Sequence, residues 1–148
     1  MPVIRGLALV FLVFFVENAA ACPFGWTPFE THCYRFFPQR QNWATAEKFC
    51  QASAANLASV RTRAHNNFLL SLVPRNSRAW IGGHDGEKES RWLWSDGSPF
   101  NYANWCFWEP NNLRRSEHCL EINKTRRRCW NDESCYAYMG YICAQTRL

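Results

Sequence analysis

Three carboxylates and two side-chain amides lie close together in the last third of the chain: Glu109, Asn111, Glu117, Asn131 and Asp132. Calcium prefers such hard oxygen ligands, whereas softer cations favour cysteine and histidine. Glu109 and Asn111 flank Pro110, and an X-Pro bond is the one peptide bond that readily becomes cis, which could aim both side chains at one point. These residues therefore predict a calcium site.

The elements around these residues include a long loop. Glycine, proline and asparagine are frequent between residues 96 and 117, which is typical of irregular structure. A loop of this length in a compact domain usually has a function or is tied to another segment, and Cys106 lies inside it. The loop is therefore expected to carry part of the site.

Helical patterns occur only before the loop. Apolar residues recur at steps of three and four over residues 42–55, with Asn42 as N-cap. A second apolar stripe over residues 64–72 is preceded by Thr62 and ended by Pro74. Beyond Pro74, short apolar pieces alternate with turn residues, as short strands do. The fold class is therefore predicted to be α+β.

The N-terminal residues indicate export. Arg5 precedes an apolar run over residues 6–16, and small residues follow at 19–21, so we interpret residues 1–21 as a signal peptide. The run is shorter than the roughly 20 apolar residues that span a bilayer. We expect a secreted mature chain over residues 22–148, without a membrane span.

Eight cysteines in 148 residues support the same interpretation. No Cys-x-x-Cys pair occurs, so the signals for a zinc ribbon and a thioredoxin-like motif are absent. An even number of cysteines in a secreted chain favours four disulfides, whose pairing the spacing alone leaves open.

Single motifs, present or missing, bear on other functions. We expect no enzyme, because neither Gly-x-Ser-x-Gly nor His-Glu-x-x-His occurs, and we expect no nucleic-acid partner. The arginines at 114–115 and 126–128 flank the predicted site and could recognise sulfated glycans or anionic cell surfaces. Asn123 begins the sequon Asn-Lys-Thr, which predicts a glycan there.

Taken together, the motifs resemble those of the C-type lectin-like domains, in their long form. They are Trp-Ile-Gly-Gly at 80–83, Glu-Pro-Asn at 109–111, Glu-x-Cys at 117–119 and Trp-Asn-Asp at 130–132. The resemblance covers residues 22–148 as one carbohydrate-recognition domain. It implies two helices, short antiparallel strands and a long calcium-binding loop. It also implies the disulfides Cys22–Cys33, Cys50–Cys143, Cys119–Cys135 and, as in secreted fish members such as venom lectins and type II antifreeze proteins, Cys106–Cys129.

In that family, calcium is held at positions matching Glu109, Asn111, Glu117, Asn131 and Asp132. The resemblance further implies that Glu109, Asn111, Glu117 and Asn131 contact two vicinal sugar hydroxyls placed on the ion. Glu-Pro-Asn members tend to prefer the equatorial hydroxyls of mannose, N-acetylglucosamine and fucose, whereas Gln-Pro-Asp members tend toward galactose. A mannose-type lectin is therefore expected.

An auxiliary calcium site in some family members would use positions near Asp85 and Glu89. This chain has Asn112 and His118 where those members have further carboxylates. Two negative charges are thus missing, which weakens the prediction of a second calcium ion.

Two biological settings fit these expectations. A secreted lectin of defence or venom would bind cell-surface glycans, and it could agglutinate cells if it formed homo-oligomers. The alternative is a domain turned to a non-sugar target, as in toxins that act on cells or proteins and in ice-binding members. The retained Glu-Pro-Asn set favours the lectin.

Overall fold

The computed structural model describes residues 21–147, which contain two α-helices and eight β-strands. The predicted signal peptide lies outside the described residues, apart from residue 21. The helices are α1 (Trp43–Ala52) and α2 (Arg63–Leu72). The strands are β1 (Thr27–Phe29), β2 (His32–Gln41), β3 (Asn56–Leu57), β4 (Ala79–His84), β5 (Leu93–Trp94), β6 (Cys119–Ile122), β7 (Asn131–Glu133) and β8 (Met139–Thr146).

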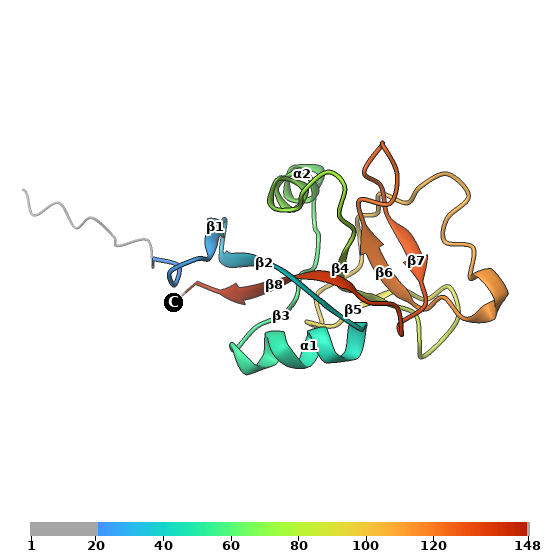
Figure 1. The fold of residues 1–148 in the computed structure, drawn as a ribbon, viewed down its shortest axis with the longest axis horizontal. Coiled ribbons are helices and arrows are strands. Elements are labelled where there is room, and N and C mark those ends of the chain that lie inside the picture. Colours follow the sequence, from blue (N-terminus) through green and yellow to red (C-terminus); the bar gives the residue numbers. More distant parts are fainter. Residues whose placement is uncertain (1–20, 148) are drawn as a thin grey trace, which may run out of the picture.

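The strands form one sheet in the order β1-β2-β8-β4-β6-β7, with β3 paired to β8 and β5 to β4. The C-terminal strand β8 is inserted between β2 and β4, so the end of the described chain lies beside β1 and β2 (Figure 1). The pairs of neighbouring strands are antiparallel, as expected for this fold class, with the exception of β4 and β8, which run parallel. The chain can pair them in parallel because a long connection separates them.

The two predicted helices are confirmed with their N-caps. The Asn42 side chain accepts a hydrogen bond from the Thr45 backbone N–H at 2.9 Å, and Thr62 accepts one from the His65 N–H at 3.0 Å. Each cap satisfies a backbone donor that the first helical turn leaves without a partner. Helix α1 ends at Ala52, short of the predicted boundary, and Ala54 takes a left-handed conformation with φ of 52°.

The main core is centred on aromatic side chains. Trp130 is fully buried and meets the rings of four neighbours, at centroid distances from 5.7 to 5.8 Å for Trp94, Trp105 and Tyr102 and 6.1 Å for Phe100. Its indole N–H donates to the Asn66 side chain on α2 at 2.8 Å. Burial of so large a side chain, with its polar atom bonded, makes Trp130 a fixed point of the fold.

Four disulfides are present, with the expected pairings: Cys22–Cys33, Cys50–Cys143, Cys106–Cys129 and Cys119–Cys135. Among the described residues no cysteine is free. A disulfide typically stabilises a fold by about 2–4 kcal/mol. The Cys106–Cys129 bridge joins the long loop over residues 95–118 to the segment before β7, and the Cys119–Cys135 bridge joins β6 to the segment after β7.

The later part of the long loop, over residues 106–118, lies at the end of the molecule opposite the ends of the described chain (Figure 1). It includes a short 3-10 helix, Leu113–Arg115. Within the described residues, no helix is both long and apolar enough to cross a membrane.

Asn123 has a structural role at the end of α2. Its side chain is 4% exposed, and its amide nitrogen donates to the backbone carbonyls of Pro74, Arg75 and Ser77. Its carbonyl oxygen accepts a hydrogen bond from Arg128 at 2.8 Å. A glycan would be joined to this same nitrogen, so the position disfavours the glycan that the sequon predicts.

Replacing Asn123 by alanine should remove the buried amide that donates to the carbonyls of Pro74, Arg75 and Ser77, and the acceptor of the Arg128 side chain. We expect Asn123→Ala to lower the free energy of unfolding by about 1–3 kcal/mol, the range for buried hydrogen-bonding groups left unpaired. Urea denaturation measures this directly. The matched control is Asn101→Ala, because Asn101 is exposed in the long loop. Equal midpoints for the two variants would contradict the structural role of Asn123.

Candidate functional site

Glu109, Glu117 and Asp132, three of the predicted site residues, lie together in the structure. One carboxylate oxygen from each lies within 4.8 Å of the others. Glu109 comes from the long loop, Glu117 from its end just before β6, and Asp132 from β7. Asp132 is 1% exposed and Glu117 8%, so two of the three carboxylates are buried.

The loop is held against β7 by backbone contacts around Trp130. The Cys106 N–H donates to the Trp130 carbonyl, and the Trp130 N–H donates to the Asn104 carbonyl, both at 2.8 Å. The adjacent Cys106–Cys129 disulfide joins the same two segments. Since Trp130 is anchored in the core, the loop inherits a fixed position beside Asp132.

Both oxygens of Asp132 accept hydrogen bonds from the loop. The Asn111 N–H donates to Oδ1 at 3.1 Å and the Asn112 N–H to Oδ2 at 2.6 Å. The Asn112 side chain in turn accepts a bond from the Glu117 N–H at 3.1 Å. The Glu109–Pro110 peptide bond is cis, as the sequence allows. The loop is thereby folded around the carboxylate cluster.

The electrostatics of the cluster favour a cation. Burial raises the pKa of Glu109 to about 7, with a further contribution from the neighbouring Asp132. Burial and the charge of Asp132 raise the pKa of Glu117 likewise to about 7. Glu117 Oε2 is buried and has no hydrogen-bond partner among the described residues. A buried oxygen without a donor, beside two other carboxylates, fits a hard cation such as calcium.

Of the two predicted amide ligands, Asn111 is joined to this cluster through its backbone N–H, and Asn131 precedes Asp132 in β7. Asn111 is exposed, and its Oδ1 accepts a hydrogen bond from the Leu113 N–H at 3.2 Å. Asn131 is buried, and its Nδ2 donates to Glu121 Oε1 at 2.8 Å. That bond sets the orientation of the amide, so the carbonyl oxygen of Asn131 points away from Glu121.

Glu121 is a supporting residue that the sequence analysis missed. It is fully buried on β6 and pairs with Arg78 at 3.1 Å and with Lys124 at 3.7 Å. Burial raises its pKa, while the bond from Asn131 and the Arg78 charge act in the opposite direction. The available signal was a glutamate inside the otherwise apolar strand Cys119–Ile122, where a charge requires partners.

Three of the four positions named for an auxiliary site come together, and Asn112 is not one of them. Asp85, Glu89 and His118 make a separate cluster with ligand atoms within 4.8 Å of one another. The Asn112 side chain contributes instead to the first cluster, through its bond from the Glu117 backbone.

A groove of about 920 Å³ opens between the long loop and the residues before β7. Its lining residues include the aromatic residues Trp105 and Phe107 and the basic residues Arg126 and Arg127. Arg128 is not part of it, because its side chain donates to the carbonyls of Leu70 and Val73 at the end of α2.

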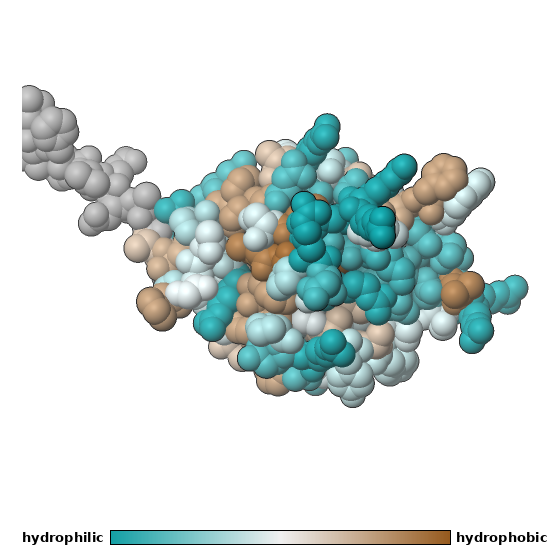
Figure 2. Space-filling model, turned by 45° about the horizontal axis from the view of Figure 1, so that its top comes forward, coloured by the Kyte–Doolittle hydropathy of each residue, from teal (hydrophilic) through white to brown (hydrophobic). Residues whose placement is uncertain are grey.

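Exposed apolar side chains project from the loop end of the molecule. Phe107 is 79% exposed, Trp108 81% and Leu113 56%. Phe107 and Trp108 contact each other edge to face, with centroids 4.6 Å apart. Figure 2 shows a largely hydrophilic surface over this end, from which single hydrophobic side chains project. Such side chains outside the core are available for contact with a ligand.

Comparison with known proteins identifies a family over most of the chain. The family model described as "Lectin C-type domain" matches residues 39–145. The galactose-specific lectin nattectin of Thalassophryne nattereri is 38% identical over 130 residues, which cover 85% of this chain and 81% of nattectin. Ladderlectin of Oncorhynchus mykiss is 42% identical over 123 residues, which cover 80% of this chain and 65% of ladderlectin.

Solved structures share the fold. Herring type II antifreeze protein superposes with a TM-score of 0.81 at 34% identity, covering 84% of this chain and 98% of that one. A calcium-independent type II antifreeze protein superposes with a TM-score of 0.83 at 30% identity, covering 89% of this chain and 99% of that one. The relatives of this chain therefore include proteins named as lectins, and the structures that share its fold include antifreeze proteins.

Proposed function

We propose a function from the family to which this chain belongs, the C-type lectin domain family. The proposal is that the protein is secreted, that it binds carbohydrate through a calcium ion, and that it is not an enzyme. The observation that carries the proposal is the convergence of Glu109, Glu117 and Asp132, with one buried oxygen of Glu117 left without a hydrogen-bond donor. Secretion is supported by the predicted signal peptide and by the pairing of every described cysteine in a disulfide.

Calcium would be held by Glu109, Asn111, Glu117, Asn131 and Asp132. Calcium takes six to eight oxygen ligands, so these residues leave room for ligands from outside the protein. A divalent cation would also offset the repulsion among three neighbouring carboxylates, which adds to the effect of burial in raising the pKa values of Glu109 and Glu117.

The sugar would complete the coordination with two vicinal hydroxyl groups. A hydroxyl can give a lone pair to the ion, accept a hydrogen bond from an asparagine amide and donate one to a glutamate carboxylate. Glu109, Asn111, Glu117 and Asn131 offer such groups around the ion. The sequence Glu109-Pro110-Asn111 supports a preference for equatorial hydroxyls, as in mannose, N-acetylglucosamine and fucose, because family members with Glu-Pro-Asn tend to show it. The relative nattectin is named galactose-specific, so family membership alone does not assign the sugar.

Anionic glycans are a second part of the proposal. Arg126 and Arg127 are exposed at the groove, and neither forms an ion pair with any described residue. A guanidinium group binds sulfate bidentately, and Phe107 offers an aromatic face in the same groove. The groove borders both chain segments of the proposed calcium site, since Phe107 lies two residues before Glu109 and Cys129 two residues before Asn131.

A non-sugar target is the alternative, supported by the close structural match to type II antifreeze proteins. One of these matches is described as calcium-independent. Retention on a sugar column that chelator reverses favours the lectin. Ice-crystal shaping without any sugar retention would favour the alternative, and light scattering would report the self-association needed to agglutinate cells.

Calcium should stabilise the folded chain. A ligand present at 100 times its Kd adds about 2.7 kcal/mol to the free energy of unfolding, so we expect a clear rise in Tm over the chelated protein. Differential scanning calorimetry measures it. Glu117→Gln should reduce the rise, whereas Glu30→Gln, an exposed carboxylate in the β1–β2 turn, should retain it. A Tm indifferent to chelator would reject the calcium site.

Exchanging the acids and amides at the sugar site should change its preference. In the double variant Glu109→Gln, Asn111→Asp, hydrogen-bond donors and acceptors around the hydroxyls are exchanged at unchanged net charge. We expect the ratio of mannose to galactose binding to fall about tenfold, equivalent to about 1.4 kcal/mol. Retention on immobilised mannose and galactose, with calcium and then with chelator, measures the ratio. Unaltered mannose preference would refute the proposed contacts.

Removing the groove arginines should affect only charged glycans. We expect Arg126→Gln, Arg127→Gln to weaken binding of a sulfated glycan about tenfold at low salt, with little change for its unsulfated counterpart. The control Arg40→Gln, Lys48→Gln removes the same charge from exposed positions on β2 and α1. If both variants lose affinity equally, net charge rather than the groove is responsible.

A further inference from the structure

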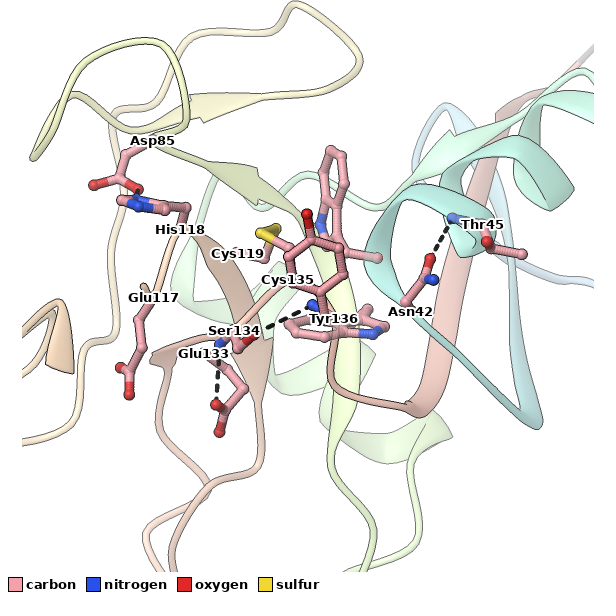
Figure 3. The surroundings of a disulfide bond; sticks show 12 residues. Asn42, Thr45, Asp85, Glu117, His118, Cys119, Glu133, Ser134, Cys135 and Tyr136 are labelled. Atoms are coloured by element: carbon pink, nitrogen blue, oxygen red, sulfur yellow. Dashed lines mark hydrogen bonds and ion pairs between the residues drawn. A yellow bond between two sulfur atoms is a disulfide. The ribbon is translucent and has the colours of Figure 1, made fainter. Parts of the chain in front are cut away.

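A second cluster of ligating side chains lies apart from the proposed calcium site. It consists of Asp85, Glu89 and His118, whose oxygen and nitrogen atoms lie within 4.8 Å of one another. Figure 3 shows the His118 ring turned toward Asp85, whereas the carboxylate of the preceding residue, Glu117, points away from this pair. The two consecutive residues therefore serve different clusters.

Two of the three side chains leave from paired strand ends. Asp85 follows the last residue of β4 and His118 precedes the first residue of β6, and His84 pairs with Cys119 across these strands. The Asp85 backbone N–H donates to the His118 carbonyl at 3.1 Å. The Cys119–Cys135 disulfide fixes the start of β6. The sheet thus sets the relative position of the Asp85 and His118 side chains without a bound ion.

Asp85 is oriented as the carboxylate of a built site. It is 2% exposed, its Oδ2 accepts a hydrogen bond from the Ser90 N–H at 3.0 Å, and its Oδ1 faces His118 Nδ1 at 3.0 Å. A backbone donor that holds one carboxylate oxygen leaves the other directed at the neighbouring groups. Such support from outside the ligand set typically orients metal-binding carboxylates.

The spacing of the three groups suits a small tetrahedral ion. His118 Nδ1 lies 3.0 Å from Asp85 Oδ1 and 3.6 Å from Glu89 Oε2. Ligands at 2.0–2.1 Å from a tetrahedral zinc ion are about 3.3–3.4 Å apart, between these two distances. Glu89 is about half exposed, so the fourth position would be open to water.

The donor set does not suit calcium. An imidazole nitrogen is a poor ligand for this hard cation, which takes six to eight oxygens, and the cluster supplies two carboxylates. The nearby Asn112 side chain is engaged by the Glu117 N–H, so it adds no oxygen here. Imidazole together with carboxylates is instead a set used by zinc and similar transition-metal ions.

We propose that Asp85, Glu89 and His118 form a binding site for a zinc-type divalent cation, distinct from the calcium site. The neutral His118 ring would bind through Nδ1, in place of its present bond to Asp85. The ion would connect the loop that carries Glu89 to the ends of β4 and β6. This site does not depend on sugar binding, since it shares none of the proposed sugar contacts.

The test is a calorimetric titration of the chelator-treated mature protein with zinc chloride, in buffer that contains saturating calcium. We expect one zinc ion per chain, and zinc binding at least about tenfold weaker in His118→Ala. Loss of a group that only orients a metal ligand already lowers metal affinity about 10–100-fold. The control His32→Ala removes a histidine outside the cluster and should bind zinc as the unaltered protein does.

Two further variants separate this site from the calcium site. Glu109→Gln should keep its zinc affinity, even where calcium binding or sugar retention is lost. His118→Asp, which replaces the imidazole by a third carboxylate, should lose zinc affinity and gain calcium affinity. Far-ultraviolet circular dichroism confirms that each variant is folded. Absence of zinc binding to the unaltered protein, or equal zinc affinity in folded His118→Ala, would overturn the proposal.

Discussion

The loop end of the molecule depends on the buried carboxylate of Asp132. A carboxylate that is 1% exposed must have its charge compensated, and two backbone N–H groups of the long loop, from Asn111 and Asn112, donate to its two oxygens. These bonds fold the loop over β7 and bring Glu109 and Glu117 beside Asp132. The same requirement for compensation leaves this group of carboxylates in need of a cation.

The rest of the fold serves to hold that carboxylate in place. Trp130 precedes Asn131 and Asp132 in the chain and is fixed by surrounding aromatic rings and by Asn66 on α2. The Cys106–Cys129 disulfide ties the loop to the same strand start. Behind the site, Glu121 joins Asn131 to Arg78, so a buried charge sets the orientation of a proposed ligand. The loop that carries the proposed ligands is thus supported by a packed core, as binding sites commonly are.

The paired ends of β4 and β6 extend this arrangement to a second cluster. Glu117 and His118 are neighbours in the chain, yet one faces the loop and Asp132 while the other faces Asp85 (Figure 3). Successive residues in extended backbone point in opposite directions, so one strand end can supply two sites. The difference between an oxygen-only set and a set that includes imidazole then separates the cations that each would bind.

What the sequence by itself determined is local. Asn42 and Thr62 mark the helix starts because an N-cap acts on its own first turn. The motifs Glu-Pro-Asn, Glu-x-Cys and Trp-Asn-Asp indicated the family, which the family model shows. Only the tertiary structure decided which residues support them. The parallel pairing of β4 with β8, the burial of Glu121, and the use of Asn123 and Arg128 to bind the end of α2 all join segments far apart in the chain. A sequon or an arginine run specifies chemistry, but burial and partners arise from the packing of distant segments, which local patterns do not encode.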